Sequence, residues 1–165
     1  MAEVTSEPPF VDEHTTVVDA GAEDVWLALA ERLDRSFGGA GAQRYARAVG
    51  CAEWAPSGPR PLATGSTIVG FRVVAAEPGS WLMLAGRHRY SDYTLTFRLD
   101  DAGGGRTRLR AETRAAFPGV LGRTYRLLVI GSRGHVVGLR RLLAATRRRA
   151  EQHAGLAGGP TAQID

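Results

Sequence analysis

Apolar and β-branched residues recur between Gly65 and Phe117 in a pattern that predicts four consecutive β-strands. Turn signals separate the strands at Pro78-Gly79, at Ser91-Asp92 and in the glycine-rich segment 101–105. Short loops of this kind join neighbouring antiparallel strands. The pattern therefore predicts an antiparallel meander, which ends at the Pro-Gly pair that follows Phe117.

The register of these hairpins follows if the first two turns are two-residue loops and the third loop runs from Asp100 to Arg106. The predicted pairs are Val73–Leu84, Phe71–Gly86, His88–Leu95, Gly86–Phe97, Leu99–Thr107, Phe97–Leu109 and Leu95–Ala111. Paired residues point to the same side of a sheet. One face is then mostly apolar: Val69, Phe71, Val73, Leu82, Leu84, Gly86, His88, Tyr90, Tyr93, Leu95, Phe97, Leu99, Leu109, Ala111, Thr113 and Phe117. The other face is rich in arginine: Arg72, Arg87, Arg89, Thr94, Thr96, Arg98, Arg108, Arg110, Glu112 and Arg114.

The segments before the meander predict a strand and a helix. FVDEHTTVV, residues 10–18, fits a first strand, and Asp19 is predicted to cap a helix over residues 21–35. That helix places Val25, Trp26, Leu29 and Leu33 on one side. Residues 37–60 give no single prediction, because RYARAVGCAEW fits a helix, a strand or one leading into the other, and APSGPRP fits a loop.

A long helical segment, residues 120–153, follows the meander. At 100° per residue one arc of this helix is mostly apolar, with His135 at its edge: Leu121, Tyr125, Leu128, Val129, Ser132, Val136, Leu139, Leu143 and Thr146. Glycines at 131, 134 and 138 fall on the far side and predict a bend or a close contact. Residues 1–9 are expected to be flexible, 10–152 to form one domain, and 153–165 to be a disordered tail.

The order of elements predicts an α+β fold. Only one sheet face is apolar, and only the last helix is long enough to cover it. A curved antiparallel β-sheet is therefore expected to wrap around the long C-terminal α-helix. A sheet that grips a helix in this way often leaves space between the two.

The opening VVDAGAEDVWLAL resembles the entry to the first helix of the START-like, or SRPBCC, superfamily. The usual APAEDVW of that superfamily appears here as residues 20–26, with Gly21 in place of proline. GSTIVGFRV, SDYTLTFRL, TRLRAETRAAF and the closing helix are also similar, so the resemblance spans residues 10–152. It implies the helix-grip fold of polyketide cyclases, lipid-transfer domains and birch-pollen-allergen-like proteins. GRHRYSDYTLTF and GRTYRLLVIGSRGH resemble a bacterial branch from which no catalytic residue can be carried over.

The polar residues of the apolar face gather at one of its ends, where Tyr125 and His135 could approach from the helix. A mostly apolar pocket with a few convergent polar groups is typical of small-molecule sites. We expect a cavity that binds a small hydrophobic molecule, such as a lipid, an isoprenoid or a polyketide. Its predicted lining is Phe71, Leu84, His88, Tyr90, Tyr93, Leu95, Phe97, Thr113, Phe117, Tyr125, Val129 and His135. The alternative is that these polar groups hydrogen-bond one another and complete the core.

Two other functions fit the sequence. A cofactor-free cyclase, aromatase or dehydratase could use His88 or a tyrosine to move protons, although no carboxylate partner lies on that face. The arginine-rich face could instead bind nucleic acid or a protein, since the net charge is +4. All 21 basic residues are arginine, which fits GC-rich coding better than selection for phosphate contacts. Trp81 and Met83 on that face would allow a homodimer contact.

The sequence also bounds the chemistry. The chain has 165 residues, enough for one domain with a real core, and no apolar run that would span a bilayer. Cys51 is the single cysteine, so no internal disulfide forms, and MAEVTSEPPF lacks the pattern of a signal peptide. A cytoplasmic location is expected. The four histidines lack metal-ligand spacing and no nucleotide-binding motif occurs, so neither metal nor cofactor is expected.

Overall fold

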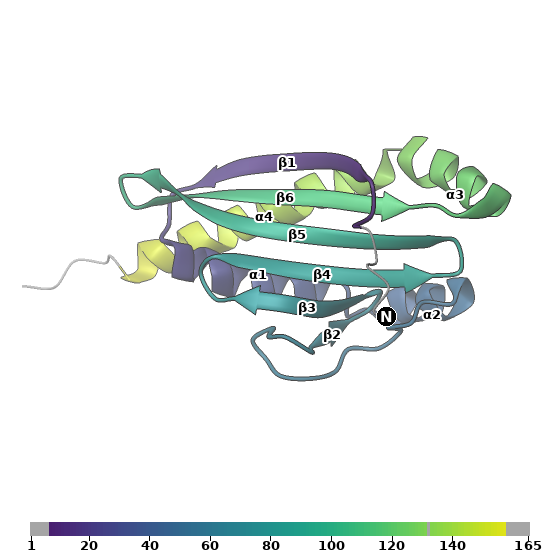
Figure 1. Cartoon of the computed structure of the whole chain (residues 1–165). Coiled ribbons are helices and arrows are strands. Elements are labelled where there is room, and N and C mark those ends of the chain that lie inside the picture. The colour runs from purple at the N-terminus through teal and green to yellow at the C-terminus, as the bar shows by residue number, and fades with distance from the viewer. Residues whose placement is uncertain (1–6, 132, 158–165) are drawn as a thin grey trace, which may run out of the picture.

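The computed structural model describes residues 7–131 and 133–157, with the backbone alone for residues 128–131. Its centre is a six-stranded antiparallel sheet in the order β1-β6-β5-β4-β3-β2, and helices α1 and α4 cover one face (Figure 1). The elements are β1 (Phe10–Val18), α1 (Ala22–Ser36), α2 (Ala40–Val49), β2 (Thr67–Ile68), β3 (Phe71–Glu77), β4 (Trp81–His88), β5 (Ser91–Gly103), β6 (Arg106–Ala116), α3 (Gly119–Gly131) and α4 (Gly134–Ala157). The predicted α+β helix-grip fold is confirmed.

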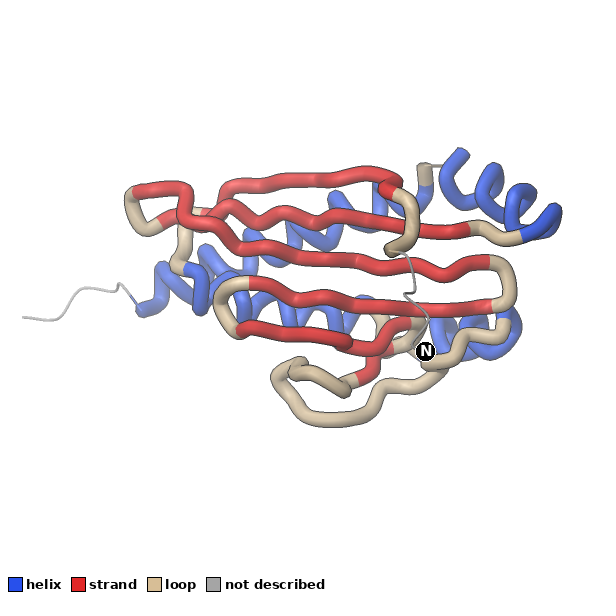
Figure 2. The backbone as a smooth tube through the Cα atoms, in the orientation of Figure 1, coloured by secondary structure: helices blue, strands red, loops and turns tan. Residues whose placement is uncertain are grey.

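Two helices, rather than the C-terminal one alone, cover the apolar face of the sheet (Figure 2). Leu29 and Leu33 of α1 are fully buried, and Leu143 of α4 is 3% exposed. The Arg149 guanidinium of α4 donates to the Glu31 carboxylate of α1 at 2.9 Å, which joins the two helices. The apolar stripe on α1 had predicted a buried helix, but its place beside α4 depends on contacts between distant segments.

The hairpin registers differ from the predicted ones, yet the residues predicted for the apolar face still lie on the same face of the sheet. The pairs that are wrong are His88–Leu95, Gly86–Phe97, Leu99–Thr107, Phe97–Leu109 and Leu95–Ala111. His88 pairs with Ser91, four residues from the predicted partner (95 to 91), and Leu99 pairs with Leu109, two residues away (107 to 109). Side chains alternate with a period of two, so an even displacement leaves each residue on its face.

The turn between β3 and β4 is three residues long instead of two, because Glu77 pairs with Trp81. A bulge between Val73 and Ala75 offsets the extra residue, so the predicted pair Val73–Leu84 is confirmed. The ladder begins at Arg72, which leaves the predicted pair Phe71–Gly86 outside it.

The strand predicted to start at Thr67 is interrupted. Gly70 adopts a φ of +86°, a left-handed conformation that ends β2 after two residues. The preceding uncertain region contains helix α2, which ends at Val49 and is followed by Gly50 in the left-handed conformation common at helix ends. The predicted cap at Asp19 is wrong: Gly21 occupies the N-cap of α1, without a side-chain hydrogen bond.

The C-terminal segment forms two helices instead of one. Arg133 has a φ of +55°, so the chain turns between α3 and α4, close to the glycines that predicted a bend. The predicted buried arc fails in α3, where Leu121 is 70% exposed, but holds in α4 at Leu139, Leu143 and Thr146. Ser132 lies outside the described residues.

The ends of the described chain depart from the expected domain limits. Helix α4 continues to Ala157, so residues 153–157 are helical rather than part of a disordered tail. At the other end, the Pro9 carbonyl accepts a hydrogen bond from the Ala115 N–H at 3.0 Å. Residues 1–6 and 158–165 lie outside the described residues. Among the described helices, none has the length and apolar character that a membrane crossing would need.

Candidate functional site

A cavity of about 740 Å³ lies at the end of the sheet where β4 turns into β5. Helices α2 and α3 lie at this end (Figure 1), and the sheet, α1 and α4 supply the other walls. Of the predicted site residues, those that line the cavity are Phe71, His88, Tyr93, Leu95, Thr113, Phe117, Tyr125 and His135.

Three of the other predicted site residues, Leu84, Phe97 and Tyr90, are not part of the lining. Leu84 and Phe97 are fully buried in the core and do not line the cavity. Tyr90 stacks on Tyr125, with ring centroids 5.5 Å apart, behind the lining. Val129 belongs to α3, but its side chain lies outside the described residues.

Two glycines allow Tyr93 to lie flat along the cavity wall. Gly86 faces Tyr93 across β4 and β5, and a Cβ at Gly86 would meet the tyrosine ring and the Gly70 carbonyl. The Tyr93 hydroxyl donates to that carbonyl at 2.8 Å. The Phe71 ring packs edge-on against Tyr93 at 5.1 Å. The missing side chain of Gly86 therefore leaves room for the aromatic ring of Tyr93.

His88 lies in an aromatic cluster at the same end. The centroid of its ring lies 5.4 Å from that of Tyr93 and 5.0 Å from that of Tyr125. The Tyr90 N–H donates to Nδ1 at 3.1 Å, so the neutral ring carries its proton on Nε2. Burial lowers the pKa of His88, and the nearby Asp92 carboxylate only partly opposes this effect. His88 is thus a neutral donor whose Nε2–H makes no hydrogen bond to another described residue.

Helices α2 and α3 meet above the cavity through two tyrosines. The hydroxyls of Tyr45 and Tyr125 are 2.9 Å apart and hydrogen-bonded. Helix α3 reaches this position because Gly122 lacks a Cβ, which would lie 2.8 Å from the Phe117 carbonyl carbon. Burial is the main cause that raises the pKa of Tyr125, and the bond to Tyr45 adds to it. The phenol therefore stays protonated at neutral pH.

Sequence reasoning missed the part of the lining that comes from the uncertain region. Tyr45 and Ala46 come from α2, and Cys51 follows that helix. Burial raises the pKa of the Cys51 thiol, and that of Tyr93 rises mainly through burial and then through Cys51. No pattern in residues 37–60 could have placed these side chains, because α2 is short and only Ala46 is buried in it. Thr94, assigned to the arginine-rich face, also contributes to the lining.

His135 contacts the carboxylate of Asp12. Asp12 of β1 lies 3.0 Å from the Nε2 of His135 and 3.2 Å from that of His14. The Nδ1 of His135 is buried and has no hydrogen-bond partner among the described residues. The contact holds the start of α4 against β1. Within the described part of the chain, no group of three or more histidine, cysteine or acidic side chains is arranged to hold a metal ion.

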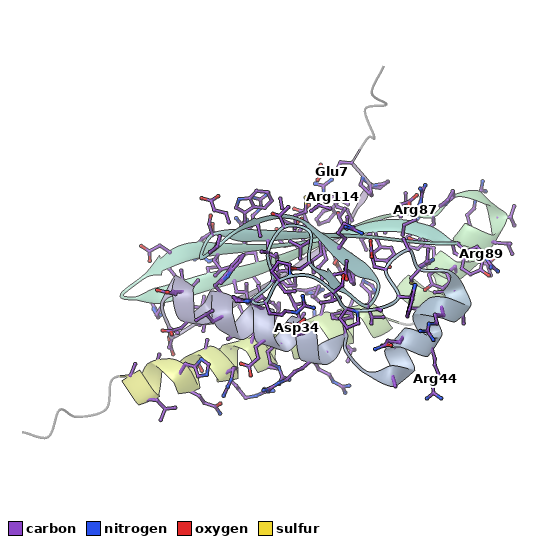
Figure 3. The ribbon with its side chains drawn as sticks, turned by 90° about the horizontal axis from the view of Figure 1, so that it is seen from below. Glu7, Asp34, Arg44, Arg87, Arg89 and Arg114 are labelled. Carbon is purple, nitrogen blue, oxygen red and sulfur yellow. The ribbon has the colours of Figure 1, made fainter. Side chains whose placement is uncertain are left out.

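Four of the seven arginines assigned to the outer face of the sheet pair with acidic side chains among the described residues. Arg114 and Glu7 lie on the side of the sheet away from the helices, and Asp34 lies on the helix side (Figure 3). Arg114 also pairs with Glu112. Three further pairs, 2.7–2.8 Å long, are Arg72–Glu53, Arg87–Asp92 and Arg110–Asp100. Pairing of this kind leaves less positive charge for phosphate contacts than the sequence suggested.

The same architecture occurs in solved structures of other proteins. Mll3558 from Rhizobium loti is 18% identical, covers 84% of this chain and 94% of its own, and superposes with a TM-score of 0.52. The solution structure of CalU16 from Micromonospora echinospora is 18% identical, covers 92% of this chain and 70% of its own, and has a TM-score of 0.51. CV1439 from Chromobacterium violaceum is 13% identical, covers 85% of this chain and 96% of its own, and has a TM-score of 0.50.

These likenesses concern the fold. The chain shares with them an α+β architecture in which an antiparallel sheet packs against a long C-terminal helix. No protein-family model matches the sequence, and no curated protein matches it either.

Proposed function

We propose that this protein binds a small hydrophobic molecule in the cavity between the sheet and helices α1 and α4. The observation that carries the proposal is the cavity itself, whose volume of about 740 Å³ lies in the range of about 300–1,000 Å³ that is typical of ligand sites. Phe71, Leu95 and Leu139, from the sheet and from α4, all line this cavity.

The polar groups of the cavity suit recognition of a mainly apolar ligand. His88 is neutral and carries a proton on Nε2, and the hydroxyl of Thr113 also lines the cavity. The hydroxyls of Tyr93 and Tyr125 are already engaged with Gly70 and Tyr45. A ligand would therefore meet a mostly apolar wall with a small number of polar groups, which orient it without a large desolvation cost.

The first experiment asks whether the cavity takes up apolar molecules. Protein purified under native conditions is extracted for mass spectrometry and titrated with the neutral fluorophore N-phenyl-1-naphthylamine. We expect a co-purified apolar compound or saturable binding of the probe. A filled, dry interior, with neither a co-purified compound nor probe binding, would overturn the proposal.

A pair of variants on β6 locates the binding site. Ala115 lines the cavity, whereas its neighbour Ala116 lies on the opposite side of the strand and does not. Ala115→Phe should fill part of the cavity and weaken probe binding at least about ten-fold. Ala116→Phe adds the same ring outside the cavity and should leave binding unchanged. Equal effects of the two variants would place the probe elsewhere.

A further inference from the structure

The charged side chains of the cavity wall are all cationic. Arg32 of α1 and Arg141 of α4 line the cavity, and its described lining includes no aspartate or glutamate. Because both helices cover the same sheet face and pack against each other (Figure 2), the two arginines belong to the helix side of the cavity, opposite the sheet. The cavity therefore combines a mostly apolar lining with positive charge on one part of its wall.

The carboxylates nearest to Arg32 in sequence are committed to other arginines. Glu31 pairs with Arg35 at 2.6 Å and with Arg149 at 2.9 Å. Asp34 pairs with Arg60 at 2.9 Å. These contacts fix the neighbouring charges and leave Arg32 without an ion pair among the described residues.

The Nε of Arg32 is buried and has no hydrogen-bond partner among the described residues. A buried N–H of a charged group that makes no hydrogen bond costs free energy, and an anion that accepts its hydrogen bond would recover this cost. Guanidinium groups bind carboxylates with matched planar geometry and short charge-assisted bonds. The wall around Arg32 is thus prepared for an acceptor that the protein itself does not supply.

We propose that the cavity selects an amphipathic carboxylic acid, with an apolar body against the sheet and its carboxylate on Arg32 and Arg141. This inference rests on the proposed function and narrows it from any apolar molecule to an anionic amphiphile. Arg32 is the principal anchor, because it is less exposed than Arg141 and its charge is less screened by water, whereas Arg141 is exposed at the wall and adds favourable charge.

The test compares an acid with its ester. The fluorescent polyene fatty acid cis-parinaric acid and its methyl ester share the same chain and differ in the charge of the head group. We expect the acid to bind at least ten times more tightly than the ester. Arg32→Gln should abolish most of this preference by weakening the acid alone, and Arg141→Gln should reduce it less.

Arg140→Gln is the matched control, since Arg140 is exposed on α4 and does not line this cavity. It removes one positive charge and should leave the preference unchanged. Thermal unfolding of each variant reports whether it is folded, and Arg32→Lys, which keeps the charge, should restore part of the preference.

The outcomes separate the two proposals. Equal binding of acid and ester to the native protein would overturn this inference and leave the proposed function standing. The inference also fails if Arg32→Gln weakens both probes equally, because Arg32 would then act only through packing. Failure of both probes and of the neutral fluorophore to bind would count against the proposed function itself.

Discussion

Gly86 and Tyr93 face each other across β4 and β5, and the tyrosine ring occupies the space where a side chain on residue 86 would lie. A Cβ there would come within 2.6 Å of Cζ of Tyr93. The ring, in turn, holds the Gly70 carbonyl through its hydroxyl at 2.8 Å. One residue without a side chain thus positions an aromatic wall of the cavity and the end of β2.

Gly86→Ala should therefore destabilise the protein. The added methyl group must displace Tyr93 or the backbone at Gly70, and overpacking of this kind costs about 1–3 kcal/mol. Chemical denaturation gives the free energy of unfolding. The control is Gly138→Ala, in the interior of α4 with open space around its Cβ, which should stabilise the helix by up to about 1 kcal/mol. A Gly86→Ala protein as stable as the native one would show that Tyr93 moves at no cost.

The hairpins show how much of the fold the sequence could predict. The wrong registers of the β4–β5 and β5–β6 pairs were displaced by an even number of residues, so the apolar face was assembled correctly from incorrect pairs. Which side chains are buried depends on the two-residue alternation along each strand. Which residues pair depends on where each turn begins and ends, as the closing pairs His88–Ser91 and Glu77–Trp81 show. Turn signals indicated three hairpins, but the β4–β5 turn lies at residues 89–90 instead of 91–92, and the other two turns differ in length from the prediction.

The candidate site could be predicted only in part, for a different reason. Its sheet residues follow from the same alternation, so His88, Tyr93 and Thr113 were found. The contact between Asp12 and His135 joins residues that are far apart in the chain, and no local pattern indicates it. The cavity volume depends on how helices α2 and α3 close one end of the sheet, and neither position is encoded by periodicity.

The apolar residues of the C-terminal helices should differ sharply in their contribution to stability. Leu121 and Leu143 lie on the same predicted arc, but Leu121 is 70% exposed and Leu143 is 3% exposed. Leu143→Ala should lower the free energy of unfolding by about 2–5 kcal/mol. Leu121→Ala should change it by less than about 0.5 kcal/mol, as surface substitutions do. Equal losses in urea denaturation would mean that α3 is packed as tightly as α4.

His88 should make the protein less stable in mild acid. Burial lowers its pKa in the folded state, so the unfolded chain binds the proton more readily. The contribution of His88 is fully present above its unfolded pKa of about 6.5 and is lost as the pH falls towards the lowered folded value. The melting temperature should fall between pH 7 and pH 5 by less in His88→Gln than in the native protein. Parallel profiles would show that His88 titrates alike in both states.

Removal of the bond between Tyr45 and Tyr125 should speed the release of a bound ligand. The two hydroxyls join α2 to α3 above the cavity at 2.9 Å, while the Tyr45 ring is 56% exposed and packs little. Tyr45→Phe removes only this hydrogen bond, whose net value is about 0.5–1.5 kcal/mol. We expect the dissociation rate of the bound fluorophore in stopped flow to rise between two-fold and ten-fold, with little change in melting temperature. An unchanged rate would mean that ligand leaves by a route that does not separate α2 from α3.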